Sequence, residues 1–265
     1  MSTASATEQK RSSISPTIYS IASVIGLFVL WIVITDTGWV GPGYLPTPQA
    51  MGKQLIALID NGYGGKPLWE HIYASLYRAL TGFAIGVLGG VPFGLFSGYN
   101  KTIGAMMSPI MAFIRPIPPI AFIPMAVLYF GLGETGKIVL IIFTAFNYSF
   151  VSAQAGAMAV PMSYYRAAES IGLTKSQIFW RIVFPSAVPH IFTGLKVAMA
   201  LSWAVVVAAE LVGAQKGLGF MISDAAQLFQ IPVVFIGIAL IGIIGLILNF
   251  ILSETENKIV HWKGR

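Results

Sequence analysis

The stretch Pro161–Pro189, PMSYYRAAESIGLTKSQIFWRIVFPSAVP, decides how this chain is interpreted, because it is the longest run in the second half that is not continuously apolar. It predicts two short helices separated by a hinge. In the first helix, four residues recur at the i, i+3, i+4, i+7 spacing of one apolar face: Tyr164, Ala167, Ala168 and Ile171. Its polar residues lie off that face.

The hinge is predicted from the residues that end one helix and begin the next. Gly172 is placed as the glycine that follows a helix C-terminus. Thr174, with Gln177 three residues later, is typical of a capping box at a helix N-terminus. Pro185 and Pro189 are expected to end the second helix. Such an amphipathic pair also suits a loop lying on a membrane surface, so its role depends on the rest of the chain.

The composition predicts an all-α integral membrane protein. Of 265 residues, 56% are hydrophobic and only 10% are charged, whereas soluble domains average about 25% charged residues. The absence of cysteine excludes disulfides, thiolate nucleophiles and cysteine-based metal sites. A net charge of +6 would suit a nucleic-acid partner in a soluble protein, but in a membrane chain it reflects topology, and no nucleic-acid partner is expected.

Residues 1–16 are predicted to form a polar cytoplasmic tail, followed by one transmembrane domain over residues 17–265. The first span is Thr17–Ile34, which carries no charge. A signal peptide is the competing interpretation, but its apolar region would be shorter, about 7–15 residues. An external loop is expected over Asp36–Trp69, with a short interfacial helix at Pro48–Ile59.

The second span, His71–Phe96, contains a glycine at every fourth position: Gly82, Gly86, Gly90 and Gly94. Small residues at this spacing let two helix backbones approach closely in lipid, so helix packing is the preferred interpretation. Arg78 lies in the same span, and we expect it to be a snorkelling or paired charge rather than a ligand.

An internal loop is predicted at Tyr99–Ser108, and a proline-rich segment follows it with Pro116, Pro118, Pro119 and Pro124. A helix cannot pass through this run undisturbed, and broken backbone at membrane depth must face protein or water. The segment therefore predicts either a broken span beside a substrate path or a stiff loop before an ordinary third span. Arg115 precedes the prolines; it either holds an inner gate or follows the positive-inside rule, and the second interpretation is favoured.

The segment Gly131–Ile138, GLGETGKI, resembles a phosphate-binding loop only superficially. Ile138 stands where such a loop needs Ser or Thr for magnesium, and no β-α-β unit surrounds it. We expect a turn between two spans.

The remaining spans are Ile138–Met158, His190–Leu211 and Ile231–Ile251, with an external loop at Val212–Gln230. The first of them carries four polar residues that favour helix–helix contacts, with a path lining as the alternative: Asn147, Ser149, Ser152 and Gln154. Basic residues concentrate on the side of residues 161–189, which is therefore the cytoplasmic side. Six transmembrane helices with both termini cytoplasmic result.

With residues 161–189 placed between two spans on the inner face, their pattern resembles the EAA loop of the membrane subunits of bacterial ABC importers. That pattern is Glu-Ala-Ala, three residues, Gly, nine residues and Ile-x-Leu-Pro. Ala167, Ala168 and Gly172 match it, and Ile182 to Pro185 follow at the right spacing. Arg166 replaces the Glu, and Phe184 replaces the Leu.

Four other segments resemble the nitrate, sulfonate and taurine branch of these importers, and within it the taurine permease subunits: RPIPPIAFIP at 115–124, YFGLGE at 129–134, VAAEL at 207–211 and KGLGFMI at 216–222.

The resemblance implies a type I ABC importer permease fold in the bacterial inner membrane and transport of a small anion, taurine or another alkanesulfonate before nitrate. It implies two copies of an ATP-binding subunit, a second and identical permease copy, and an external substrate-binding protein. ATP and magnesium would be bound by the partner subunit, and this chain would hold no cofactor or metal.

The resemblance also assigns two sets of residues. Residues 161–189 would form the coupling segment, with these in contact with the ATPase: Tyr164, Arg166, Ala167, Ala168, Glu169, Gly172 and Pro185. The path or its gate would involve Arg115, Pro116, Pro118, Pro119, Ser202 and Glu210. For Glu210 we expect a gate or helix-pairing role, with Lys137 or Lys216 as its partner.

Two other functional classes are weaker. An intramembrane enzyme would need a nucleophile with its base or a metal cluster, but His71, His190 and His261 lie too far apart in the topology to share a site. A self-contained ion-coupled carrier would usually contain internal repeats, and none is found.

Overall fold

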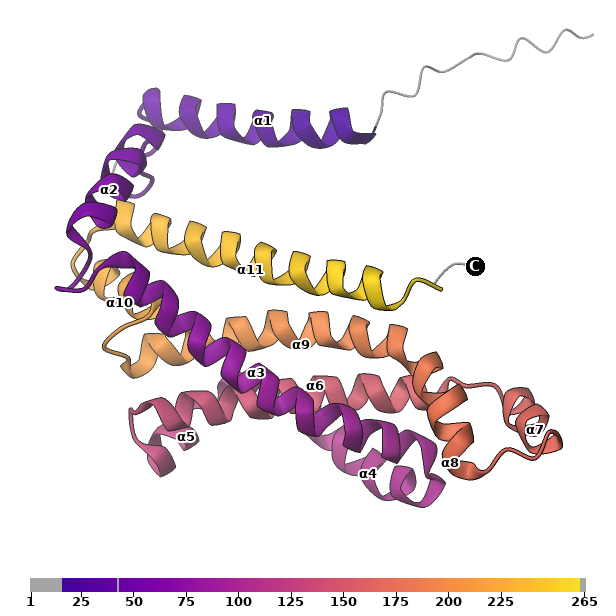
Figure 1. The fold of residues 1–265 in the computed structure, drawn as a ribbon. Coiled ribbons are helices and arrows are strands. Elements are labelled where there is room, and N and C mark those ends of the chain that lie inside the picture. The colour runs from indigo at the N-terminus through magenta and orange to yellow at the C-terminus, as the bar shows by residue number, and fades with distance from the viewer. Residues whose placement is uncertain (1–15, 42, 263–265) are drawn as a thin grey trace, which may run out of the picture.

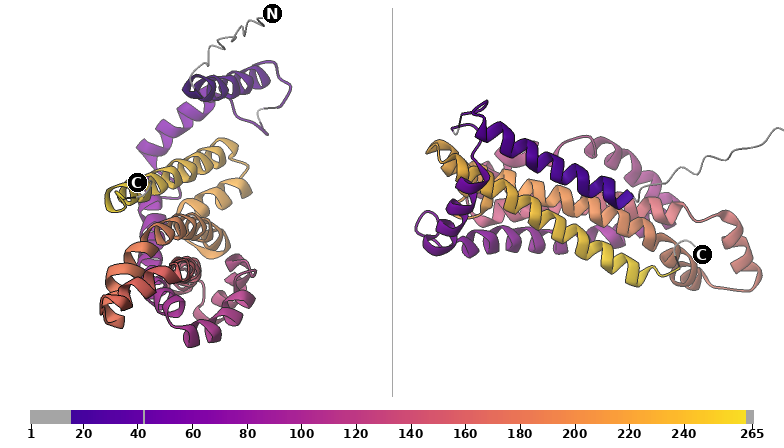
Figure 2. Two further views of the ribbon diagram at one scale, coloured as in Figure 1. Left: turned by 90° about the vertical axis from the view of Figure 1, so that its right-hand side faces the viewer. Right: turned by 90° about the horizontal axis from the view of Figure 1, so that it is seen from above.

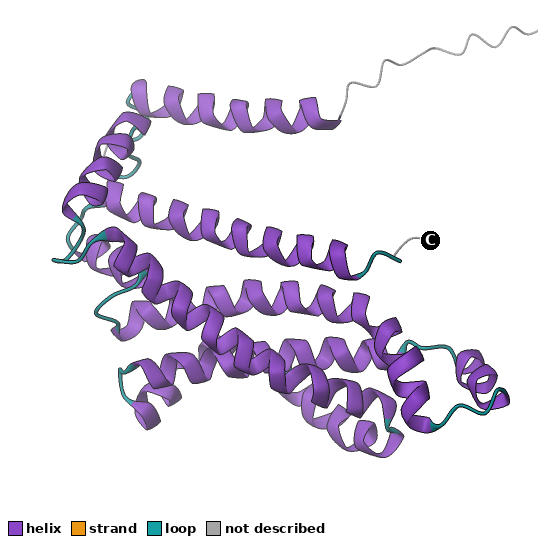
Figure 3. Cartoon of the chain, in the orientation of Figure 1, coloured by secondary structure: helices purple, strands orange, loops and turns teal. Residues whose placement is uncertain are grey.

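The structure is a computed structural model that describes residues 16–41 and 43–262. The predicted polar tail falls almost entirely outside the described residues. Within them the chain is built of helices joined by short loops, and no strand is present (Figure 3).

Five helices are long and apolar enough to cross a membrane. They are α1 (Pro16–Asp36), α3 (Leu68–Tyr99), α6 (Glu134–Met158), α9 (Phe184–Gly213) and α11 (Ile231–Ile259). The sixth span, which lies third in chain order, is broken. In it α4 (Lys101–Ile114) meets the short η1 (Pro119–Phe122) and α5 (Ile123–Phe130) at a bend of 81°. The predicted number of six spans is confirmed.

The glycines of α3 pack against α6, as predicted. A side chain added at Gly86 would meet the Cβ of Ala145 and the carbonyl of Ile142 at 2.6 Å, so the two backbones touch there. Gly82, Gly90 and Gly94 meet successive turns of α6 in the same way. Because the contacts advance together along both chains, α3 and α6 run parallel. The close approach maximises dispersion contacts, which are the main attraction between helices in lipid.

Helix α9 packs on the other side of α6 and runs in the opposite direction. Gly194 of α9 lies against Ser152, and Gly156 of α6 lies against Ala187. The indole of Trp203 on α9 donates to the carbonyl of Ile241, which ties α11 to the same core. The centre of the molecule is therefore the group α3, α6 and α9, with α11 at its edge (Figure 1).

Helix α1 stands apart from this core in the left view of Figure 2, and none of the residues in its apolar window is buried. It is joined to the core through α2 (Pro48–Asn61), so the helix predicted at Pro48–Ile59 is present. The beginning of α1 and the C-terminus lie at the same end of the molecule as α7 (Met162–Ser170), while α2 and α10 (Leu218–Gln227) lie at the other end (Figure 1).

Two predicted loops contain helices. The prediction of an internal loop at Tyr99–Ser108 is wrong, because α4 begins at Lys101. The side chain of Asn100 accepts from the backbone N–H groups of Thr102 and Ile103 and so starts this helix. The external loop at Val212–Gln230 likewise contains α10.

Candidate functional site

The segment 161–189 forms two short helices, α7 and α8 (Lys175–Ile178), with a hinge at Gly172, as predicted. Gly172 has φ +78°, in the left-handed region that favours glycine. Its N–H donates to the carbonyl of Glu169, and the N–H of Leu173 donates to the carbonyl of Ala168. These two bonds define a Schellman motif, which satisfies the last carbonyls of α7 and fixes the exit direction of the chain.

The capping box of α8 is also confirmed. The N–H of Gln177 donates to the hydroxyl of Thr174 at 3.3 Å, and the N–H of Thr174 donates to the side-chain carbonyl of Gln177 at 2.8 Å. Both ends of the hinge are therefore held by hydrogen bonds, and the connection between α7 and α8 has a defined geometry rather than being a flexible loop.

The prolines do not end the second helix, contrary to expectation. A π-helical turn at Phe179–Val183 joins α8 directly to α9. In this turn the N–H of Phe184 bonds five residues back to the carbonyl of Phe179. Pro185 follows directly after this turn, and Pro189 lies inside α9. The coupling segment is thus continuous with a transmembrane helix.

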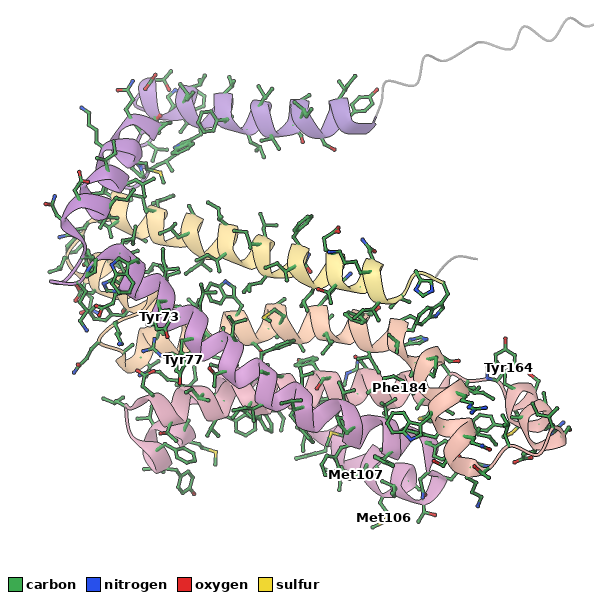
Figure 4. The ribbon with its side chains drawn as sticks, in the orientation of Figure 1. Tyr73, Tyr77, Met106, Met107, Tyr164 and Phe184 are labelled. Carbon is green, nitrogen blue, oxygen red and sulfur yellow. The ribbon has the colours of Figure 1, made fainter. Side chains whose placement is uncertain are left out.

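The apolar face of α7 is divided between the core and the surface. Ala168 is 2% exposed and packs with Phe179, Val183 and other residues at the α7 end of the core. Tyr164 and Ile171 are 55% and 76% exposed, and Tyr164 points away from the ribbon in Figure 4. Arg166, Ala167 and Glu169 are exposed as well.

A tyrosine contact anchors α7 and α8 to α3. The ring of Tyr165 stacks on that of Tyr99 with centroids 6.4 Å apart, and the Tyr99 hydroxyl donates to the carbonyl of Lys175 at 3.0 Å. Burial raises the pKa of the Tyr165 phenol, so it remains neutral at physiological pH. One side of α7 is therefore held by its own chain, and the other side is free for contact.

The proline segment forms the break between α4 and α5, and neither of these two helices is long enough to be an ordinary uninterrupted span. Pro119 is buried, whereas Arg115, Pro116 and Pro118 are exposed. Arg115 and Pro119 line a small hollow together with Asn147 and Tyr148 of α6.

This hollow corrects the position of Arg115. Asn147 lies 13 residues after Glu134, where α6 begins, and 11 residues before Met158, where it ends. At 1.5 Å per residue this is about 20 Å along the helix, near the middle of a hydrocarbon layer of about 30 Å. Arg115 therefore lies beside the middle of α6 and not beside its inner end.

The polar residues of α6 divide into two groups. The side-chain amide of Gln154 donates to Ser97 of α3 at 2.8 Å, as expected for a helix–helix contact, and Ser149 bonds to its own helix. By contrast, the side-chain oxygens of Asn147 and of Ser202 on α9 are buried without a hydrogen-bond partner among the described residues.

At the α10 end, Glu210 forms a buried ion pair with Arg78 of α3, with a distance of 2.6 Å between Oε1 and Nη1. This corrects the expected pairing with Lys137 or Lys216. The ammonium of Lys137 donates to the carbonyls of Leu132 and Gly213, and only the main-chain carbonyl of Lys216 joins the network. The predicted pairing of Arg78 is confirmed.

The network extends to a third helix. The guanidinium of Arg78 also binds Glu134 at the start of α6, and Ser75 and the N–H of Gly219 donate to Glu210 at 2.8–2.9 Å. Neither Ser75 nor Glu134 was predicted as a member of this site. Glu134 could have been found, because it lies at a span boundary on the same side as Arg78.

Nearby, Nε2 of His71 lies 3.1 Å from the carbonyl oxygen of Tyr63, and Nδ1 accepts from the N–H of Gly217 at 3.3 Å. Both ring nitrogens are thereby occupied with holding two loops together. Among the residues that the structure describes, no group of three potential ligands for a metal ion is found.

Residues 90–256 match the family described as binding-protein-dependent transport system inner membrane component. The chain is 36% identical to the taurine transport system permease protein TauC of Escherichia coli over 92% of this chain and 90% of that protein. It is 35% identical to the nitrate import permease protein NrtB of Synechocystis, over 88% of this chain and 86% of that protein.

Among solved structures, the chain is similar to a chain of the MetNI methionine ABC transporter in an inward-facing conformation. The TM-score is 0.61 with 20% identity, covering 75% of this chain and 96% of the other.

Proposed function

We propose that this chain, which belongs to the family of binding-protein-dependent transport system inner membrane components, carries taurine or a related alkanesulfonate across the bacterial inner membrane. It is the permease subunit of an ABC importer and not an enzyme. Such a permease works with an ATP-binding partner and a substrate-binding protein. We propose that two identical copies of the chain meet two ATP-binding subunits, which bind ATP and magnesium.

The observation that carries the proposal is the construction of α7. Its outer side presents Tyr164, Ala167 and Ile171 to a partner, while Ala168 and Tyr165 fasten it to the core. An apolar side chain such as Ile171 gains on the order of 1.5–3 kcal/mol when a partner covers it completely. This arrangement supports α7 as the docking element for the ATP-binding subunit.

The movement would be transmitted through two connections. The first is the continuous path from α8 through the π-helical turn into α9. The second is the Tyr99–Tyr165 stack, which connects α7 to α3. Because Gly172 is held by the Schellman motif, displacement of α7 would be passed to α9 rather than absorbed in the loop.

Within this account, the exposed residues Arg166 and Glu169 would border the docking surface, and Pro185 would set the start of α9. Pro116, Pro118 and Pro119 would keep the sixth span broken beside the path, and Ser202 would face it from α9. Glu210 would have a pairing role rather than contact the anion, since Arg78 neutralises it.

Nitrate is the second candidate substrate, supported by the 35% identity to the nitrate permease. The importer should be reconstituted in liposomes with its ATP-binding and substrate-binding proteins, and uptake of taurine, ethanesulfonate and nitrate compared. We expect ATP-dependent uptake of the sulfonates. ATP-dependent uptake of nitrate alone would contradict the sulfonate proposal.

A further inference from the structure

We propose that Arg115, Asn147 and Tyr148 form a transient site, halfway across the membrane, for a small anion that also carries a hydrogen-bond donor, such as an aminosulfonate. The inference rests on the proposed transport function and assigns the residues that the substrate would meet inside the path. These side chains line one hollow, with Ile117, Pro119 and Val151 as its apolar walls.

Arg115 differs from three other basic residues of the transmembrane helices, Arg78, Lys137 and Lys196. Arg78 pairs with Glu210 and Glu134, Lys196 pairs with Glu256, and Lys137 is bound to two carbonyls. No described carboxylate lies within ion-pair distance of Arg115. A cation at mid-depth is costly without a counter-charge or water, and such residues commonly mark an ion or substrate path. A guanidinium suits an anion with several oxygens, because its donors lie in one plane.

Asn147 supplies an acceptor for the hydrogen-bond donor of the ligand. The residue is 8% exposed, lines the same hollow, and its Oδ1 has no partner in the described chain. A buried acceptor left unpaired costs roughly 1–3 kcal/mol, so a ligand that donates a hydrogen bond to it is favoured. A sulfonate at Arg115 and an ammonium at Asn147 satisfy both groups, whereas nitrate has no donor for Asn147.

Arg115 lines the hollow and is itself exposed. Its volume is only about 10 Å³ in the single chain, which is enough for about one water molecule. The site is therefore one wall of a cavity, and the second permease copy would supply the opposite wall.

The chain has no cysteine, which allows a direct test of the local charge. Val151→Cys places a single thiol in the wall of the hollow. Its modification by methanethiosulfonate reagents that add a 2-sulfonatoethyl or a 2-trimethylammonioethyl group is measured with the full chain in nanodiscs. We expect Arg115→Gln to lower the anionic-to-cationic rate ratio by roughly three- to tenfold.

Two control variants accompany this test. Lys101→Gln removes an exposed positive charge from the opposite end of α4, and should leave the ratio unchanged. Arg115→Lys retains the charge and should preserve most of the preference. A ratio that Arg115→Gln does not change would overturn the anion site.

Transport then tests the donor requirement. In the reconstituted importer, Arg115→Gln should lower uptake of both taurine and ethanesulfonate at least tenfold. Asn147→Leu should lower taurine uptake about tenfold more than ethanesulfonate uptake, because only taurine carries the ammonium. Equal losses would overturn the role of Asn147. If the wild-type importer takes up neither sulfonate, the proposed function fails, while the labelling ratio still decides whether Arg115 attracts anions.

Discussion

Arg78 on α3 and Glu210 on α9 form an ion pair of 2.6 Å although both side chains are almost completely buried. Ser75, Gly219 and Glu134 satisfy the remaining hydrogen-bonding groups of the pair. The pair joins α3, α6 and α9 at the α10 end, whereas apolar packing joins them at the α7 end. A movement introduced at α7 therefore acts on helices that are fixed at their opposite ends.

Removing one member of this pair should destabilise the protein strongly. Glu210→Leu leaves the buried guanidinium with Glu134 and the Lys216 carbonyl as partners, and we expect a loss of about 3–5 kcal/mol. The double variant Arg78→Met with Glu210→Leu should recover part of the loss, because the remaining Glu134 is half-exposed and can be hydrated. Thermal unfolding in detergent measures both effects. A double variant whose loss equals the sum of the single losses would contradict the pairing.

The glycine contacts between α3 and α6 predict a position-specific effect. Gly86→Val places a side chain against the backbone of α6, which cannot move aside, and should cost about 1–3 kcal/mol or prevent folding. Gly26→Val is the matched control on α1, because nothing lies within 4 Å of the added Cβ. Thermal unfolding midpoints should fall for the first variant only. Similar midpoints for both variants would argue against the close approach.

The hinge at Gly172 predicts a loss of coupling without a loss of assembly. Gly172→Val forces a β-branched residue into the left-handed region, at a cost of at least about 1–2 kcal/mol, although the space around it is empty. We expect the variant to insert and to bind the ATP-binding subunit, but to transport fewer molecules per ATP hydrolysed. Gly172→Asn, which tolerates this conformation, is the control. Normal ATP-driven uptake by the Val variant would show that the hinge does not transmit movement.

The exposed side of α7 predicts where the ATP-binding subunit attaches. Ile171→Asp should reduce the amount of that subunit copurified with the chain, with little change in stability, since Ile171 contacts little of its own chain. Trp39→Asp is a control at the opposite end, where the indole is 84% exposed. If the two variants retain equal amounts of the partner, α7 is not the docking surface.

Features fixed by local spacing could be predicted from the sequence. The six spans, the Gly172 hinge and the glycine contacts all follow from the period of a helix or from one residue type at one place. The start of α4 could also have been predicted, because Asn100 is a favourable capping residue.

Features that depend on tertiary structure could not be predicted from the sequence. The partner of Glu210 lies 132 positions away in the chain, and several basic residues near that end were equally plausible. The position of Arg115 depends on the 81° bend between α4 and α5. The prolines predict that the helix is interrupted, but they do not predict the direction of the bend. The π-helical turn before Pro185 could not be predicted from the sequence, because a change of helical register leaves no signal in the composition.

We expect this chain to transport only when an ATP-binding subunit drives it. Taurine uptake should be measured in proteoliposomes that contain the chain and the substrate-binding protein, with and without the ATP-binding subunit, at a fixed ion gradient. Uptake is expected only when both that subunit and ATP are present. Uptake without the subunit, driven by the ion gradient, would instead identify a self-contained carrier.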